Sequence, residues 1–194
     1  MNWLAHVFLS EKNIDYQLGN LLADPLKART WPDASQGVVD GIKMHTKIDS
    51  FTDSHASVSK SKARLGKKGY LKPVIIDIVY DHFLHKHWDT YADERLDDFI
   101  SNFYQEAEVA IQSYPDQAKR FVQRVIQSNV LTSYHSNAGI AQALGRIDNR
   151  LSERVLKKET ASQYMPVVKD ELENIEKDFK EFFPELIEFT KQQN

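Results

Sequence analysis

The stretch KPVIIDIVYDHFLHKHW, residues 72–88, decides how the rest of the chain folds. Pro73 suits the first turn of a helix, because that position needs no N–H donor and proline already has a helical φ. The following residues are apolar on nearly every side, so we expect a central helix over 74–88. Asp77 and Asp81 interrupt this run at i and i+4. Two carboxylates on one buried face need a cation, either a metal ion or a basic side chain from elsewhere in the chain.

The rest of the sequence also has helical spacing. Seven glycines and six prolines in 194 residues leave long segments of 3.6-residue period, which favour helices with short connections. We therefore expect an all-α fold, a single compact multi-helix domain over residues 1–194. The other helices are expected at 3–9, 16–23, 35–52, 96–113, 115–129, 138–144 and 152–190. Pro166 is expected to break or kink the last of them.

Composition excludes several classes of protein. A net charge of -3 gives no general attraction to nucleic acid or to anionic membranes. Cysteine is absent, which removes disulfides and thiolate chemistry and is typical of the reducing cytoplasm. Residues 1–10 lack the features of a signal peptide, and no apolar stretch approaches the roughly 20 residues that span a bilayer. We expect a cytoplasmic protein without nucleic-acid or membrane partners, and no pattern indicates its oligomeric state.

A group of possible metal ligands follows the spacing of one helix face. His45, Asp49 and Asp53 stand at i, i+4 and i+8, within about 80° of one another around the axis. His45 and Asp49 are about 6 Å apart along the axis and can share one ion. Asp53 is about 12 Å from His45, which suits an outer position, a second metal or a helix cap. The alternative is a solvated face, but such faces usually carry residues that form helices better than histidine and aspartate do.

Two further residues widen this group. His6 lies within an apolar helical segment, and Asp24 ends another just before Pro25. A lone buried histidine is more often a hydrogen-bonded core residue, but here it accompanies two Asp/His clusters. Oxygen and imidazole ligands without sulfur select for Mn, Mg, Fe or Zn. Such a centre hydrolyses phosphoesters by activating water and neutralising phosphoryl oxygens, and the motifs of competing mechanisms are absent from this sequence.

Four strings carry these residues: MNWLAHVFLS (1–10), LGNLLADPLK (18–27), GIKMHTKIDSFTDSH (41–55) and DIVYDHFLHKHW (77–88). In order and spacing they resemble the acyl carrier protein phosphodiesterase family. The resemblance implies an HD-like helical metal phosphohydrolase, active in fatty acid biosynthesis and lipid metabolism. The implied reaction is hydrolysis, usually with Mn²⁺, of the phosphodiester that joins 4'-phosphopantetheine to the serine of holo acyl carrier protein.

The resemblance also implies roles for individual residues. The implied metal ligands are Asp24, His45, Asp49, Asp77 and Asp81. The implied catalytic residues are His6, His82 and Asp49, with the two histidines as ligands or proton-transfer groups. Further positions of the family's motif are Asn20, Asp53, His55 and His87. Thr46 stands where the family often has arginine, and His85 lies outside the pattern, so the substrate preference of this chain stays open.

A basic stretch next to these strings suggests a partner. Residues 60–72 contain six positive charges and no acid. Such a surface would attract an acidic acyl carrier protein in a salt-dependent way, although a solvated basic loop has the same composition. The expected docking residues are Lys60, Lys62, Arg64, Lys67 and Lys68.

Two other functions fit the same residues. One is an HD-like phosphohydrolase that acts on a nucleotide or another small phosphoester by the same metal chemistry. The other is a non-catalytic helical binding module whose Asp/His groups form a structural ion site or a salt-bridge network. A requirement for divalent metal separates the two enzymes from the module. Charge reversal of the docking residues separates a protein substrate from a small one.

Overall fold

The computed structural model describes residues 1–193, and these residues form helices without any strand. The α-helices are α1 (Trp3–Phe8), α2 (Ile14–Leu22), α3 (Gln36–Ser54), α4 (Ala56–Arg64), α5 (Lys72–Lys86), α6 (Trp88–Tyr91), α7 (Leu96–Ala110), α8 (Asp116–Gln127), α9 (Asn137–Asp148), α10 (Glu153–Leu156) and α11 (Met165–Lys191). The all-α prediction is confirmed. The predicted single domain includes Asn194, which lies outside the described residues.

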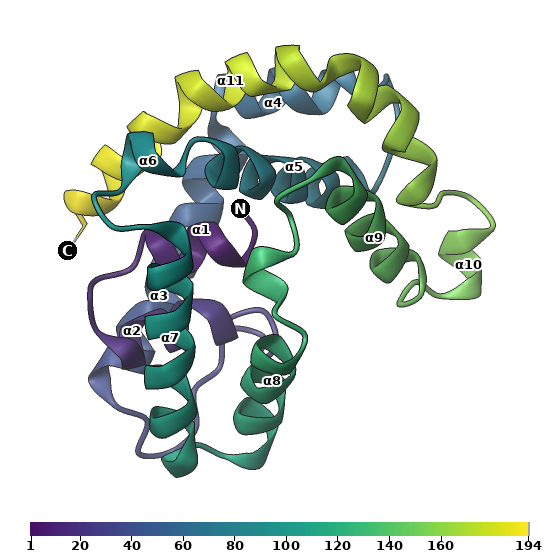
Figure 1. Cartoon of the computed structure of the whole chain (residues 1–194). Coiled ribbons are helices and arrows are strands. Elements are labelled where there is room, and N and C mark those ends of the chain that lie inside the picture. Colours follow the sequence, from purple (N-terminus) through teal and green to yellow (C-terminus); the bar gives the residue numbers. More distant parts are fainter. Residues whose placement is uncertain (194) are drawn as a thin grey trace.

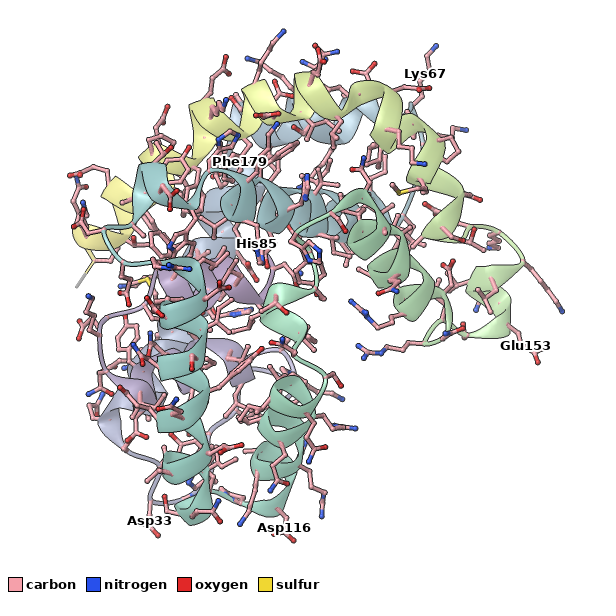
Figure 2. All side chains as sticks on the ribbon, viewed as in Figure 1. Asp33, Lys67, His85, Asp116, Glu153 and Phe179 are labelled. Carbon is pink, nitrogen blue, oxygen red and sulfur yellow. The ribbon has the colours of Figure 1, made fainter. Side chains whose placement is uncertain are left out.

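The central helix of the molecule is α5. It lies beneath α11 and α4, with α2, α3 and α7 gathered on one side and α9 on the other (Figure 1). Tyr80 and Phe83 on α5 are fully buried, and their ring centroids lie 5.3 Å and 5.7 Å from that of Phe179 on α11. Figure 2 shows Phe179 between these two helices. The apolar run read from the sequence therefore forms the centre of the core, as expected.

Helices α2 and α3 touch through their backbones because glycine occupies the contact. A Cβ atom added at Gly41 would lie 2.0 Å from the carbonyl oxygen of Tyr16 and 2.8 Å from the nitrogen of Asn20. A Cβ atom at Gly19 would lie 2.3 Å from the carbonyl oxygen of Val38. No other residue fits either position without moving a helix, and this close approach positions the site described below.

Two expectations about helix boundaries are wrong. No helix is expected over the basic stretch 60–72, but its first part belongs to α4, in whose first turn Ser57 N donates a hydrogen bond to Nδ1 of the His55 ring. The break expected at Pro166 in the helix over 152–190 lies before that residue, between α10 and α11, and Pro166 stands in the first turn of α11. The carboxylate of Asp148 accepts hydrogen bonds from the backbone nitrogens of Ala161 and Ser162, where a short 3-10 helix (Ser162–Tyr164) begins just before α11.

None of the helices of the described residues combines the length and the hydropathy that a bilayer span requires.

Candidate metal centre

Two buried histidines from different helices stack on one another. His6 belongs to α1 and His45 to α3, and their rings lie 4.0 Å apart at an angle of 15°. They are 1% and 6% exposed. Asp49, one turn after His45, brings its carboxylate to both rings. The possible ligand atoms of these three residues lie within 4.8 Å of one another, so one ion could contact all three.

A chain of hydrogen bonds fixes which ring nitrogen of His6 carries hydrogen. The hydroxyl of Ser10 donates to the carbonyl oxygen of His6, so Ser10 Oγ accepts from Asn20 Nδ2. Asn20 therefore turns its acceptor Oδ1 to His6 Nδ1, at 2.8 Å, and that nitrogen must donate. The unprotonated Nε2 then faces two further acceptors, the carbonyl oxygen of Met1 at 3.1 Å and Asp49 Oδ1 at 3.3 Å. Three electron-rich atoms that face one another favour a cation, and the N-terminal ammonium of Met1 lies 3.3 Å from one of them, Asp49 Oδ1.

His45 is anchored in the same way. Its Nδ1 donates to the backbone carbonyl oxygen of Asn20 at 2.9 Å, which the close packing of α2 and α3 makes possible. Its Nε2 lies 3.1 Å from Asp49 Oδ2 and 3.3 Å from Asp24 Oδ1. Neither contact has the geometry of a hydrogen bond, however, so the buried Nε2 of His45 has no hydrogen-bond partner among the described residues. An orphaned imidazole nitrogen beside two carboxylates fits a metal ligand.

The charges around the two rings separate their pKa values. Burial lowers the pKa of His6 to about 4, so this ring is neutral. Burial also acts to lower the pKa of His45, but Asp24 and Asp49 outweigh it and raise the value to about 9. Burial opposes ionisation of Asp49, yet its contacts with His45 and His6 hold the pKa of its carboxyl well below the ordinary value. The two carboxylates therefore favour the charged form of the His45 ring.

Asp24 connects the cluster to solvent. Its side chain is 77% exposed, and its contact with His45 lowers the pKa of its carboxyl. It also lines a cavity of about 470 Å³. Asp24 thus lies at the boundary between the buried histidines and the cavity.

The two acids of α5 lie beside the cluster and make different contacts. Asp77 pairs with the N-terminal ammonium of Met1 at 3.2 Å, and the same ammonium lies 3.3 Å from Asp49. Asp81 is fully buried and accepts hydrogen bonds from the backbone nitrogens of Leu4 and Ala5, at 2.9 Å and 3.2 Å. Burial raises the pKa of Asp81 to about 7. Asp81 thus caps the first turn of α1, while the ammonium group supplies the cation that Asp77 needs.

The remaining predicted positions lie apart from the His6–His45 pair. His82 Nδ1 donates to the carbonyl oxygen of Tyr134 at 2.7 Å and lines a different cavity, of about 740 Å³. His87 pairs with Glu176 on α11 at 2.6 Å. Asp53 pairs with Lys62 at the surface, at 2.7 Å. The structure therefore brings together Asp24, His45, Asp49 and His6 and does not bring His82 to them.

The expected docking residues are partly neutralised by acids of α11 and α3. Arg64 contacts Asp178 at 2.7 Å, and Lys60 contacts Glu181 at 3.5 Å. Lys67 and Lys68 are exposed and, within the described part of the chain, have no carboxylate oxygen within 4.0 Å. Lys67 lies at the opposite end of the molecule from Asp116 (Figure 2).

Sequence patterns alone did not indicate the role of Ser10, although one signal was present. Ser10 follows His6 by four residues, which places its hydroxyl near the carbonyl oxygen of His6 at the end of α1. Its hydrogen bond to that carbonyl orients Asn20 and through it His6.

The fold and the cluster together define an all-helical protein with an internal histidine–aspartate centre suited to a divalent cation. Comparison with known families sharpens this class. The family model described as acyl carrier protein phosphodiesterase matches residues 1–186, and the chain belongs to this family. Phosphodiesterases hydrolyse phosphodiester bonds, so the protein is an enzyme of the hydrolase class.

Individual relatives match over the whole chain or most of it. An acyl carrier protein phosphodiesterase of Pectobacterium atrosepticum is 26% identical over 195 residues, which cover 100% of this chain and 99% of the relative. One of Klebsiella pneumoniae is 28% identical over 196 residues, 98% of each chain. One of Photorhabdus laumondii is 33% identical over 150 residues, 74% of each chain. No solved structure matches the chain, so the HD-like relationship stays a prediction.

Proposed function

We propose that this protein is a divalent-metal-dependent phosphodiesterase that removes 4'-phosphopantetheine from the serine of holo acyl carrier protein. The observation that carries the metal dependence is the buried Nε2 of His45, which faces two carboxylates without a hydrogen-bond partner among the described residues. Membership in the family supports the substrate. Together they favour the enzyme over a non-catalytic binding module.

The metal would be held by the Nε2 atoms of His6 and His45 and by the carboxylate of Asp49, with Asp24 as a further oxygen ligand on the cavity side. This nitrogen and oxygen set suits Mn²⁺, and Mg²⁺, Fe²⁺ or Zn²⁺ can bind similar donors. When bound, the ion would activate water and stabilise negative charge on the phosphoryl oxygens.

The protein's own residues prepare the ligand atoms. Asn20 receives hydrogen bonds from both rings, so the two Nδ1 atoms carry the hydrogens and the two Nε2 atoms point to the ion site. His45 must lose the proton that Asp24 and Asp49 stabilise at its Nε2 before it can bind metal. Metal binding should therefore release a proton into solution.

Electrostatic attraction would bring the acidic acyl carrier protein to the enzyme. Lys67 and Lys68, which keep their charges uncompensated, are the part of the expected docking surface best suited to attract an acyl carrier protein. The absence of cysteine is consistent with action in the cytoplasm.

The test is incubation of the purified protein with holo acyl carrier protein and Mn²⁺, followed by mass spectrometry for loss of the phosphopantetheine arm. We expect complete loss of the reaction in EDTA and its recovery on addition of Mn²⁺. Hydrolysis that is unaffected by EDTA would contradict the metal centre. Hydrolysis of a small phosphodiester but not of the carrier protein would favour the small-phosphoester alternative.

A charge-reversal experiment tests the partner. Lys67→Glu together with Lys68→Glu should slow hydrolysis of the carrier protein and leave cleavage of bis(p-nitrophenyl) phosphate unchanged. Equal persistence of both activities would show that docking does not use this turn.

A further inference from the structure

The cavity that reaches Asp24 is lined by arginines without acidic partners. Arg124 comes from α8, Arg146 from α9, and Arg150 follows α9. Within residues 1–193, the arginines that form ion pairs with acids are Arg64, Arg95 and Arg120. The three cavity arginines therefore have no carboxylate oxygen within 4.0 Å.

This arrangement is unexpected in an acidic chain. The sequence contains 28 acids and 25 lysines and arginines, so acidic partners are abundant. On α4, for example, Arg64 forms ion pairs with Asp178 and Glu171. In the cavity, Arg146 instead contacts the hydroxyl of Ser133 at 3.3 Å. Arg124 and Arg150 are exposed and Arg146 is half-buried, so their guanidinium groups are accessible to an anionic ligand at this cavity.

The same cavity also has an apolar lining. Ile78 of α5, Phe121 and Val125 of α8, and Ile147 of α9 line it. Trp3 packs edge-on against Phe121, with ring centroids 5.6 Å apart. In Figure 1, α8 and α9 both lie below α5, with α8 beside α7 and α9 toward the right, and the cavity has lining residues from α5, α8 and α9. A ligand that fits must therefore combine an anionic group with a less polar chain.

We propose that this cavity binds the phosphate-bearing arm of the substrate, with Arg124, Arg146 and Arg150 as its phosphate-binding residues. Guanidinium groups bind phosphate oxygens in pairs, which fixes orientation as well as charge. The apolar lining accepts the pantetheine chain, and the cavity reaches the metal centre at Asp24, whose carboxylate contacts His45. The proposal rests on the proposed function, because it names the part of the enzyme that recognises that substrate.

The experiment measures binding separately from turnover. Isothermal titration calorimetry of metal-free protein with 4'-phosphopantetheine compares wild type, Arg146→Gln, Arg150→Gln and Arg124→Gln. The matched control is Arg120→Gln, one turn from Arg124 on the same helix, 69% exposed and paired with Asp116. Each variant loses one positive charge, so general electrostatics are equal. We expect each cavity variant to weaken binding at least 10-fold and Arg120→Gln to change it less than 2-fold.

Two further comparisons test whether binding depends on the phosphate and on the positive charge. Pantetheine without phosphate should bind at least 10-fold more weakly than 4'-phosphopantetheine to wild type, and Arg146→Lys should recover part of the binding lost in Arg146→Gln. Circular dichroism melts identify any variant that fails to fold, and its lysine version then replaces it. Cavity variants that bind as tightly as Arg120→Gln would overturn the proposal, even if holo acyl carrier protein is hydrolysed. Arginine-dependent binding without such hydrolysis would instead support the cavity and contradict the proposed function.

Discussion

Two groups of histidines are anchored in the same way but face different surroundings. In the first, His6 and His45 each donate from Nδ1 to Asn20, and the opposite nitrogens face Asp49. In the second, each ring donates one hydrogen bond to a backbone carbonyl oxygen and lines the larger cavity. These bonds are His82 Nδ1 to Tyr134 O, His85 Nε2 to Leu131 O and His135 Nδ1 to Thr132 O.

The difference lies in the carboxylates. Among the described residues, no carboxylate oxygen comes within 4.0 Å of a ring nitrogen of the second group, whereas Asp49 contacts both rings of the first. Burial lowers the pKa values of His82 and His85, which favours their neutral forms where no carboxylate faces them. An anchored imidazole thus becomes a candidate ligand only where an acid faces its free nitrogen.

The largest effect is expected from Asp49→Asn, which removes the acid that distinguishes the two groups. Since even a supporting partner of a metal ligand is worth about 10–100-fold, we expect metal affinity and hydrolysis to fall by more than about 100-fold. Calorimetric titration with Mn²⁺ and the mass spectrometric assay measure both. Asp53→Asn, on the same helix and paired with Lys62, is the control and should resemble wild type. Similar losses in both variants would contradict the assignment.

The next effect is expected from Asn20→Ala, which leaves the ligands in place and removes an anchor. His6 Nδ1 loses its acceptor, so its Nε2 is no longer held toward Asp49. We expect metal affinity to fall about 10–100-fold. An affinity equal to that of wild type in a folded Asn20→Ala protein would show that the anchor is dispensable.

A smaller effect, on stability, is expected from Gly41→Ala. The added methyl group would meet the carbonyl oxygen of Tyr16, so α3 must move away from α2 and overpacking should cost about 1–3 kcal/mol of unfolding free energy. Thermal denaturation measures this cost. Gly145→Ala is the control, because nothing lies within 4 Å of its added carbon and alanine stabilises a helix interior by up to about 1 kcal/mol. A melting temperature for Gly41→Ala at or above that of wild type would contradict the close packing.

The smallest effect on activity is expected from His82→Gln, in the second group. Hydrolysis and Mn²⁺ affinity should stay within about 3-fold of wild type, since a substitution outside the site acts on stability instead. Burial lowers the pKa of His82 in the folded state. Below pH 6.5 the unfolded chain therefore binds more protons than the folded protein does, and the free energy of unfolding decreases as the pH is lowered. The variant should show a shallower loss of unfolding free energy between pH 6.5 and 5. A loss of hydrolysis comparable to that of Asp49→Asn would assign His82 to the catalytic centre after all.

Local patterns predicted what lies on one helix. The i, i+4 spacing of His45 and Asp49 was enough to place both side chains at one point, and the apolar run around Asp81 was enough to place α5 at the centre. The role of Asp81 was not predictable, because its partners are the backbone nitrogens of a helix distant in sequence. The common cavity of Arg124, Arg146 and Arg150 was not predictable for the same reason, since α8 and α9 bring these residues together only in the folded chain.

The walls of the Asp24 cavity have a consequence for how this enzyme could diversify. The histidines and acids of the centre come from residues 6–49, whereas the arginines and most of the apolar lining come from residues 121–150. The proposed metal centre and the proposed arm-binding cavity thus come mostly from separate portions of the chain. Replacements within 121–150 could redirect the enzyme to a phosphoester with a different arm while the hydrolytic apparatus remains intact.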